Sequence, residues 1–443
     1  MTARPPISRP RPASGFVLRF RYVVALAAVL IAFAAALAYW TGTYDPQMLH
    51  GFSVPWPDPT MEALCVLAGS ALILVPMFWV WKKRTIDYLA LVLPLEAINL
   101  FAYFAISATA YKIPKEANGI LQMAGLLLML NAVGFCILLA SCFASYKAAG
   151  FFRGRLPALA HPQELLDRRM QRVLRIGGCL CVLLIIAPMI YIGSIPLFAG
   201  GGDSRVSLVV EDPLRAGYNF AETIFPFLVG GLAVILFRKP RRIAGIDGLI
   251  FLALLAVQVL STDRSAFLFA MMAVVVLLSM EKRWPRWLLL LIFTGYISFF
   301  TVFAGFSALM RTNADKLKSG AALAASIEET FMGDNVIDLH DGAWVLSHWD
   351  FEPLLGKTYL GGAFSMMPSG LFPQKKEWHL GLTALRIVGW SEADIEKHFG
   401  LRISFFGESF LNFGAAGVVT LAVVLGMFFG AALRLIHLAA AGA

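Results

Sequence analysis

The sequence predicts an all-α membrane protein, a polytopic bundle of about ten transmembrane helices with a large, partly helical loop before the last helix. The first observation is composition, because 59% of the residues are hydrophobic and 15% are charged, whereas soluble domains average about 45–50% and about 25%. The second is that apolar runs of about 20 residues recur along the chain, the length at which a helix crosses a bilayer. A soluble fold is therefore excluded.

The apolar runs divide the chain into a bundle and its flanking segments. They occupy residues 22–40, 62–81, 86–107, 119–145, 175–199, 217–237, 243–260, 266–280, 287–306 and 404–433. We expect residues 22–306 to form a bundle of nine helices and residues 404–443 to contribute the final helix and C-terminus. The Pro- and Arg-rich residues 1–21 are expected to be a disordered cytoplasmic tail.

The distribution of basic residues predicts the orientation of the bundle. With the N-terminus in the cytoplasm, the basic clusters in 82–84, 146–175, 238–242 and 282–286 all lie inside. The short loops on the other side contain few basic residues, as the positive-inside rule requires. These few are Lys112, Lys115, Arg205, Arg215 and Arg264.

Residues 307–403 form a long segment between the last two spans. Long loops translocate whatever their charge, so we expect this one outside the cytoplasm. It contains helical patterns, such as 321–332 and 391–399, and four tryptophans. A loop of this length without structure would be unusual, and we therefore expect a small folded cap over the bundle.

Several functions are excluded or disfavoured by what the sequence contains. The formal net charge of +9 comes from clusters between apolar runs, and no RNA-binding motif accompanies it, so no nucleic-acid partner is expected. All five cysteines lie inside apolar runs, where they fit as small apolar residues. No spacing matches a zinc site and no ATP-binding motif is present. We expect neither a metal nor a cofactor.

An ionisable residue inside a span indicates a compensating partner or a function, because placing it in the bilayer costs roughly 2.5–3.5 kcal/mol. The candidates are Glu96, Glu222, Asp247 and Glu408. Asp247 is expected to form a local ion pair with Arg241 or Arg242. Glu96 and Glu222 could be neutralised inside the bundle or could serve a function, and the sequence leaves both interpretations open.

Arginines recur at the predicted outer face. The set comprises Arg205, Arg215, Arg264, Arg311 and Arg402. A guanidinium group stays charged and offers a bidentate fork suited to phosphate, so the set could bind an anionic headgroup whose lipid tail stays in the bilayer. The alternative is interfacial snorkelling and local ion pairs, for example between Arg264 and Asp263.

The final span carries polar residues that membrane packing does not explain. Glu408 and Asn412 are four residues apart and so share one face of a helix, near its predicted outer end. Glycines at 407, 414, 417, 426 and 430 are small enough for close helix packing. The glycines are accounted for by packing, whereas the carboxylate and the amide indicate a site.

Three segments resemble the Wzy-type oligosaccharide repeat-unit polymerases. The final helix contains GESFLNFGAAGV (residues 407–418), the loop contains YLGGAFSMMPSGLFPQKK (359–376), and a turn before an apolar helix reads STDRSAF (261–267). Each is similar to a family pattern: Gly-Glu…Asn-Phe-Gly, Pro-x-x-Leu-Phe/Trp-Pro-x-Lys, and a Ser/Arg-containing turn. Together they cover less than a tenth of the chain.

The resemblance implies a C-type glycosyltransferase-like membrane enzyme of the bacterial inner membrane with its active site open to the periplasm. Its substrates would be oligosaccharides linked to undecaprenyl pyrophosphate, and a chain-length regulator protein could be a partner. The motif match carries functional roles to Arg264, Arg402, Glu408, Asn412, Lys375 and Lys376. Arg264 and Arg402 would hold pyrophosphate, and Glu408 would act as general base or orient an arginine. Arg205, Arg215 and Arg311 rest on topology alone.

Two other functions remain as alternatives. An O-antigen ligase-like enzyme would use the same donor but transfer glycan to lipid A, and its histidine motif has no clear counterpart around His340, His348, His379 or His398. A glycolipid transporter would be expected to show paired repeats, which the sequence lacks. A structural subunit of an envelope complex would need none of these side chains for activity.

Overall fold

A computed structural model describes most of the chain from Pro59 onward. The described residues are 59–109, 118–149, 168–193, 195, 212–238, 245–261, 264–281, 284–312, 322–325, 339–364, 367, 371–375, 377–395 and 400–441. Within these ranges all regular secondary structure is helical. The predicted tail at 1–21 and the predicted span at 22–40 lie outside them. Every later predicted span overlaps a described helix.

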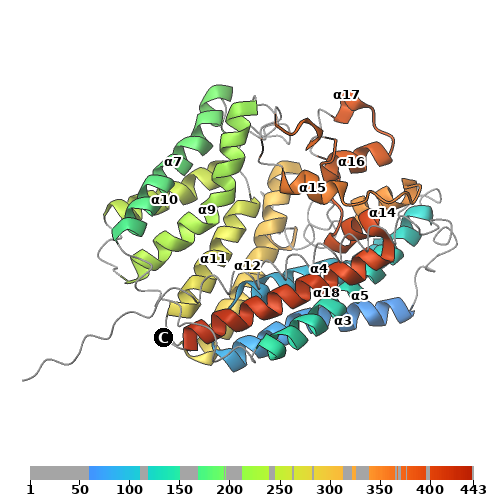
Figure 1. Ribbon diagram of the computed structural model, residues 1–443, viewed down its shortest axis with the longest axis horizontal. Helices are drawn as coiled ribbons and strands as arrows, with labels where there is room; N and C mark the ends of the chain where they lie inside the picture. The colour runs from blue at the N-terminus through green and yellow to red at the C-terminus, as the bar shows by residue number, and fades with distance from the viewer. Residues whose placement is uncertain are drawn as a thin grey trace, which may run out of the picture.

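One group of helices packs around a shared core that includes the C-terminal helix. Its members are α3 (Pro59–Lys83), α4 (Tyr88–Thr109), α5 (Asn118–Ala148) and α18 (Phe405–Ala441). Helices α5 and α18 lie side by side along most of their length (Figure 1). Their interface includes fully buried Leu127, Phe406 and Phe410. Because aliphatic and aromatic side chains interdigitate there, α18 is fixed firmly against α5.

A second group forms around another core. Its members are α7 (Arg168–Ile192), α9 (Asp212–Arg238), α10 (Ile246–Ser261) and α11 (Arg264–Glu281). Cys181, Phe225 and Leu254 are fully buried at its centre. Helix α12 (Arg286–Thr312) packs against α3, α4 and α11 and so contacts both groups.

Six described helices are long and apolar enough to cross a membrane. They span Glu62–Lys83, Met123–Ala148, Arg169–Ile192, Leu214–Phe237, Arg286–Phe303 and Phe405–Arg434. The segments Tyr88–Phe101, Ile246–Ser261 and Phe267–Ser279 are apolar but shorter. At 1.5 Å per residue, the 16 residues of α10 extend about 24 Å, less than the roughly 30 Å hydrocarbon core. The protein is therefore a multi-pass membrane protein, with fewer full-length spans among the described helices than the sequence predicts.

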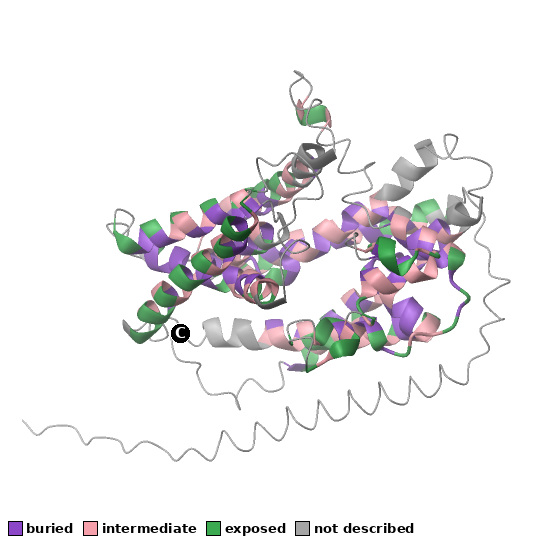
Figure 2. Ribbon diagram, turned by 90° about the horizontal axis from the view of Figure 1, so that it is seen from above, coloured by how far each residue is buried: buried purple, intermediate pink, exposed green. Residues whose placement is uncertain are grey.

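The outer surface of the helices suits a lipid environment. Buried residues line the facing sides of neighbouring helices and exposed residues lie on the outer sides (Figure 2). Large apolar side chains are among the exposed ones, with Ile190 74% and Phe227 75% exposed. An apolar belt of this kind is costly in water and favourable in a bilayer.

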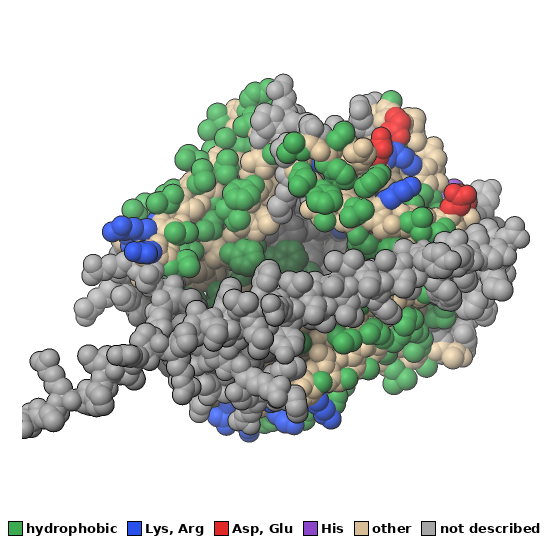
Figure 3. All heavy atoms as spheres, viewed as in Figure 1, with side chains coloured by type: hydrophobic (Ala, Val, Ile, Leu, Met, Phe, Trp, Pro, Cys, Tyr) green, Lys and Arg blue, Asp and Glu red, His purple; other side chains and the backbone are tan. Residues whose placement is uncertain are grey.

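Charges are distributed unevenly over the surface. In the space-filling view of Figure 3, Lys and Arg side chains gather along the lower and left edges, whereas at the upper right basic and acidic side chains lie next to one another. Asp247 is buried at 2% exposure and forms a bidentate ion pair with Arg175, with contacts of 2.6 and 3.0 Å. Arg241 and Arg242, the partners expected from the sequence, lie outside the described residues, so that expectation stays untested. The observed partner, Arg175, comes from α7, against which α10 packs.

Residues 339–395, which lie between α12 and α18, are called the cap, and their described part contains four short helices and a 3-10 turn. Its elements are α14 (Leu339–His348), α15 (Lys357–Ala363), η7 (Pro373–Lys375), α16 (Leu380–Ile387) and α17 (Glu392–Ile395). In Figure 1 the cap lies near the N-terminal end of α18. The predicted partly helical character of this segment is confirmed.

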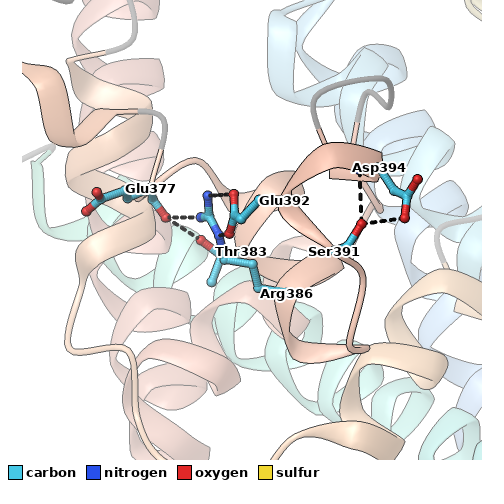
Figure 4. A network of polar contacts seen from close by, with 6 residues as sticks. All are labelled: Glu377, Thr383, Arg386, Ser391, Glu392 and Asp394. Atoms are coloured by element: carbon cyan, nitrogen blue, oxygen red, sulfur yellow. Dashed lines mark hydrogen bonds and ion pairs between the residues drawn. The ribbon is translucent and has the colours of Figure 1, made fainter.

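Polar contacts hold the outer part of the cap together. The Arg386 guanidinium donates to both carboxylate oxygens of Glu392, at 2.7 and 3.2 Å, and to the Glu377 carbonyl at 3.0 Å (Figure 4). This contact lowers the pKa of the Glu392 carboxyl below its ordinary value. One arginine thus ties α16 to α17 and to the preceding turn.

Candidate functional site

The candidate site lies where the cap meets a break in α18. Gly414 has φ 65° and ψ −161°, a conformation that is essentially restricted to glycine. In an uninterrupted helix the Leu411 and Asn412 carbonyls would bond to residues 415 and 416, and the break opens this turn. The N–H groups of Leu354 and Leu355 donate to these two carbonyls at 3.0 and 3.1 Å. The cap chain therefore docks on α18 through backbone hydrogen bonds.

The docking segment itself has an unusual backbone. Phe351 and Leu355 have φ values of 63° and 50°, and Gly356 follows at 83°. Bulky residues rarely adopt the left-handed region, and such strain persists only where surrounding contacts hold it. The contacts to α18 supply that restraint and set the start of α15 beside residues 408–412.

Asn412 organises the polar contacts. Its side chain is fully buried. Its amide nitrogen donates to the Thr358 hydroxyl at 2.7 Å and to the Glu408 carbonyl at 2.9 Å, and its oxygen accepts the Gly356 N–H at 2.9 Å. Because these bonds use both amide hydrogens and the amide oxygen, the orientation of Asn412 is fixed.

Glu408 is joined to the same network. Its Oε1 accepts the Thr358 hydroxyl at 2.7 Å, and Thr358 is only 2% exposed. Its Oε2 makes no hydrogen bond with the described residues. Glu408 is half-buried rather than enclosed. One carboxylate oxygen is thus positioned by the protein and the other remains available to a ligand.

Two hydroxyls adjoin this carboxylate. The Tyr359 hydroxyl lies near Glu408 and Ser409, yet neither it nor the fully buried Ser409 hydroxyl completes a hydrogen bond of normal geometry in the described structure. Burial raises the pKa of Tyr359, and the nearby Glu408 charge raises it further. Tyr359 therefore stays protonated, and its buried hydroxyl lies beside Glu408.

Aromatic rings form the surroundings of the network. Tyr359 stacks on Phe413, with ring centroids 6.2 Å apart and planes inclined at 16°. Trp349 packs on Phe410 at 5.7 Å and on Phe351 at 5.0 Å. Rigid aromatic walls keep the short helix α15 in register with α18.

Arg402 lies immediately before α18, with its side chain exposed. Its N–H donates to the Asp341 carboxylate of α14 at 3.2 Å. Two residues later, the Ser404 hydroxyl donates to Asn131 at 3.0 Å and accepts the Gly407 N–H at 3.2 Å, which caps α18. The position of Arg402 next to the start of the site-bearing helix is thus firmly set.

Lys375 lies in η7 and donates from Nζ to the Met367 carbonyl at 2.6 Å. The loop that carries it is packed through Phe372, whose ring contacts Phe364 at 5.1 Å and Trp378 at 5.4 Å. The structure shows no contact between Lys375 and Glu408. The expected role of Lys375 in substrate binding stays a prediction.

The remaining predicted arginines are placed only in part. Arg215 lies near the start of α9 and is half-buried. Arg264 begins α11 and Arg311 lies near the end of α12, and the described structure includes the backbone of both but not their side chains. Arg205 and Lys376 lie outside the described residues. Convergence of the five arginines thus stays a prediction.

Sequence reasoning missed the partners that position Glu408 and Asn412. Thr358 directly precedes the loop motif that begins at Tyr359, and Gly356 lies two residues further upstream. The signal available in the sequence is the pair of polar side chains, Glu408 and Asn412, in an otherwise apolar final helix. A buried amide and carboxylate in an apolar helix require donors from another segment, and the hydroxyl next to the loop motif is one.

The other two carboxylates inside the helices have amide neighbours. Glu96 accepts a hydrogen bond from Asn99 at 3.1 Å, and Glu222 accepts a long one from Gln258 at 3.4 Å. Neither pairs with a cap residue in these contacts. Glu408 is joined to the cap through the Thr358 hydroxyl.

Comparison with protein-family models, curated proteins and solved structures finds no match to this chain.

Proposed function

We propose that this protein is a membrane glycosyltransferase of the Wzy type that polymerises oligosaccharide repeat units carried on undecaprenyl pyrophosphate. The observation that carries the proposal is the network of Glu408, Thr358 and Asn412. It joins the final helix to the cap beside Tyr359. The final helix and the loop that begins at Tyr359 carry two of the three segments that resemble that family. A multi-pass helical protein also suits a substrate with a long lipid tail.

The proposed reaction transfers a glycan between two lipid carriers. A hydroxyl of the acceptor repeat unit attacks the anomeric carbon of the donor glycan and forms the new glycosidic bond. The bond from that carbon to the phosphate oxygen breaks, and undecaprenyl pyrophosphate leaves with the electron pair. Glu408 takes the acceptor proton on Oε2 as general base, while Thr358 holds Oε1.

The leaving pyrophosphate needs positive charge where its own charge develops. We assign this role to Arg264 and Arg402, with Arg205, Arg215, Arg311, Lys375 and Lys376 contributing to binding. Guanidinium groups already fixed in place stabilise a developing anion without reorganisation. In this proposal arginines take the place that a divalent metal occupies in many other enzymes of phosphate chemistry, so the reaction is metal-independent.

The proposed setting follows from the substrates and from the distribution of charge. We place the protein in the bacterial inner membrane with its N-terminus in the cytoplasm and the cap and Glu408 at the periplasmic face. The basic ends of α3 and α7 then lie on the cytoplasmic side, as the positive-inside rule requires. A chain-length regulator protein is the expected protein partner.

The experiment that tests the proposal uses purified protein in nanodiscs supplied with lipid-linked repeat units of its host. A ladder of lengthening glycans on a gel is expected. Arg264→Ala should abolish the ladder, whereas Arg169→Ala, which removes an exposed charge from α7, should preserve it. Transfer that appears only after lipid A is added would show a ligase-like enzyme instead. No product in either reaction would overturn the proposal and favour a transporter or an envelope scaffold.

A further inference from the structure

A cluster of cations and aromatic rings lies at the end of the bundle opposite the break in α18. Lys83 Nζ lies 5.0 Å from the Tyr146 ring centroid and 5.6 Å from that of Trp79. Arg434 Cζ lies 5.1 Å from the same Tyr146 ring, and its Nη1 donates to the Tyr146 hydroxyl at 3.3 Å. Lys147 Nζ lies 4.4 Å from the Phe143 ring. The ends of α3, α5 and α18 thus bring three cations together.

The positive charge of this cluster is not neutralised by the described protein. Within the described ranges, Lys83, Lys147 and Arg434 contact aromatic rings and a phenol hydroxyl but form no ion pair with a carboxylate. Arg434 Nε is buried and makes no hydrogen bond in that part of the chain. Ring contacts orient the cations while leaving their charge unpaired. The cluster therefore concentrates positive charge that forms no ion pair within the described ranges.

An apolar pocket adjoins the cluster. Its cavity volume is about 50 Å³, and it is partly open to the surroundings. Apolar side chains from four helices form most of its lining, among them Val75, Leu93, Leu139, Phe143 and Leu433. Trp79 and Phe143 line the pocket and also carry Lys83 and Lys147 on their rings. The pocket and the cations are therefore parts of one feature.

The pocket opens toward the surface that faces lipid. Val75 and Phe143 are 45% and 53% exposed, and both lie in helices that are apolar enough to cross the membrane. Asp87 is the acidic residue in the lining, but it is 5% exposed and its Oδ1 accepts the Ala90 N–H at 2.8 Å, which caps α4. The accessible charges at the pocket mouth are accordingly positive.

We propose that this feature is a binding site for an anionic phospholipid, with its phosphate on Lys83, Lys147 and Arg434 and an acyl chain in the pocket. A basic pocket between transmembrane helices beside a bilayer surface is the arrangement that recognises anionic headgroups. The site lies on the basic side of the protein, where the positive-inside rule places the cytoplasmic leaflet. The proposal does not depend on the enzymatic function.

The test measures lipid bound to the full-length protein by native mass spectrometry in detergent, with dioleoyl phosphatidylglycerol or dioleoyl phosphatidylcholine added. Phosphatidylglycerol should bind, and Lys83→Gln with Lys147→Gln should weaken that binding roughly 30-fold, from about 1 kcal/mol per cation near an anionic lipid. The control is Arg169→Gln with Arg172→Gln, which removes equal charge from exposed positions on α7. It should leave binding unchanged.

A second variant tests the acyl-chain pocket separately. Val75→Trp places a large ring at an exposed position of the pocket lining and should abolish phosphatidylglycerol binding while size-exclusion elution and helical circular dichroism stay unchanged. Glycerol 3-phosphate, which has the phosphate but no acyl chain, should not displace the lipid. Equal binding of phosphatidylcholine, equal weakening in the α7 control, or displacement by glycerol 3-phosphate would each overturn the proposal.

Discussion

Replacing Gly414 by alanine tests how the break in α18 forms the candidate site. At φ 65° and ψ −161° an alanine is strained by about 1–3 kcal/mol. If α18 straightens instead, the Leu411 and Asn412 carbonyls return to the helix and the N–H groups of Leu354 and Leu355 lose their acceptors. Each lost bond costs about 0.5–1.5 kcal/mol. The variant therefore either keeps the break and bears the strain, or straightens and loses the two hydrogen bonds. Because straightening relieves the strain, the two costs do not add, and we expect a destabilisation of about 1–3 kcal/mol.

Thermal unfolding of the detergent-solubilised protein, followed by tryptophan fluorescence, measures this effect. The matched control is Gly295→Ala in α12, where an added Cβ meets nothing within 4 Å and φ is ordinary. Alanine in a helix interior is neutral or stabilising by up to about 1 kcal/mol. Gly414→Ala should lower Tm, and Gly295→Ala should not. Equal Tm values for the two variants would refute the argument that the break holds the cap.

Three further predictions concern other buried polar contacts. Thr358→Val removes the hydroxyl that bonds Glu408 and accepts from Asn412, so it should cost about 1–3 kcal/mol, whereas Thr358→Ser should largely retain Tm. Burial raises the pKa of Asp87 from 3.8 to about 6. Because its folded pKa exceeds its unfolded one, its neutral form is favoured on folding and stability is lost as pH rises through about 6. Asp87→Asn should therefore raise the free energy of unfolding at pH 8 by up to about 3 kcal/mol, seen as a higher Tm, and change Tm little at pH 4. A larger increase in Tm at pH 4 than at pH 8 would contradict the expected pH dependence. Arg175→Gln removes the guanidinium that pairs with buried Asp247. Because Arg175 is 36% exposed, we expect a loss of about 1–3 kcal/mol of stability rather than the full cost of breaking a buried pair, measured as the Tm difference from Arg172→Gln.

The helices were predictable from the sequence because the apolar runs are long and separated by charged clusters. Their ends were less predictable. Helix α7 begins at Arg168 and ends at Ile192, about seven residues before the predicted run of 175–199 at both ends. An apolar run marks where a helix meets lipid, and the helix continues through polar residues such as Arg168 and Arg172 beyond that point.

Of the candidate site, the sequence predicts the residues of the final helix but not their partners in the cap. Glu408 and Asn412 stood out because polar side chains in an apolar helix need a reason, but their partner Thr358 lies 50 residues from Glu408 and is an ordinary loop threonine in sequence. Gly414 was interpreted as a packing glycine like Gly426 and Gly430. The latter two do pack closely, against the α5 backbone at Leu138 and Cys142, whereas Gly414 supplies a backbone conformation. Sequence alone does not separate these two uses of glycine.

The role of Glu408 as general base is the central claim, and one measurement tests it most directly. Wild type, Glu408→Gln and Glu96→Gln are compared in nanodiscs with lipid-linked repeat units, and the rate of ladder growth is measured alongside binding of the donor. Glu96→Gln makes the same change at another carboxylate within the bundle, next to Asn99. We predict that Glu408→Gln retains donor binding and slows polymerisation by about 10²–10⁴-fold, whereas Glu96→Gln polymerises at the wild-type rate. Polymerisation by Glu408→Gln at the rate of Glu96→Gln would contradict the account.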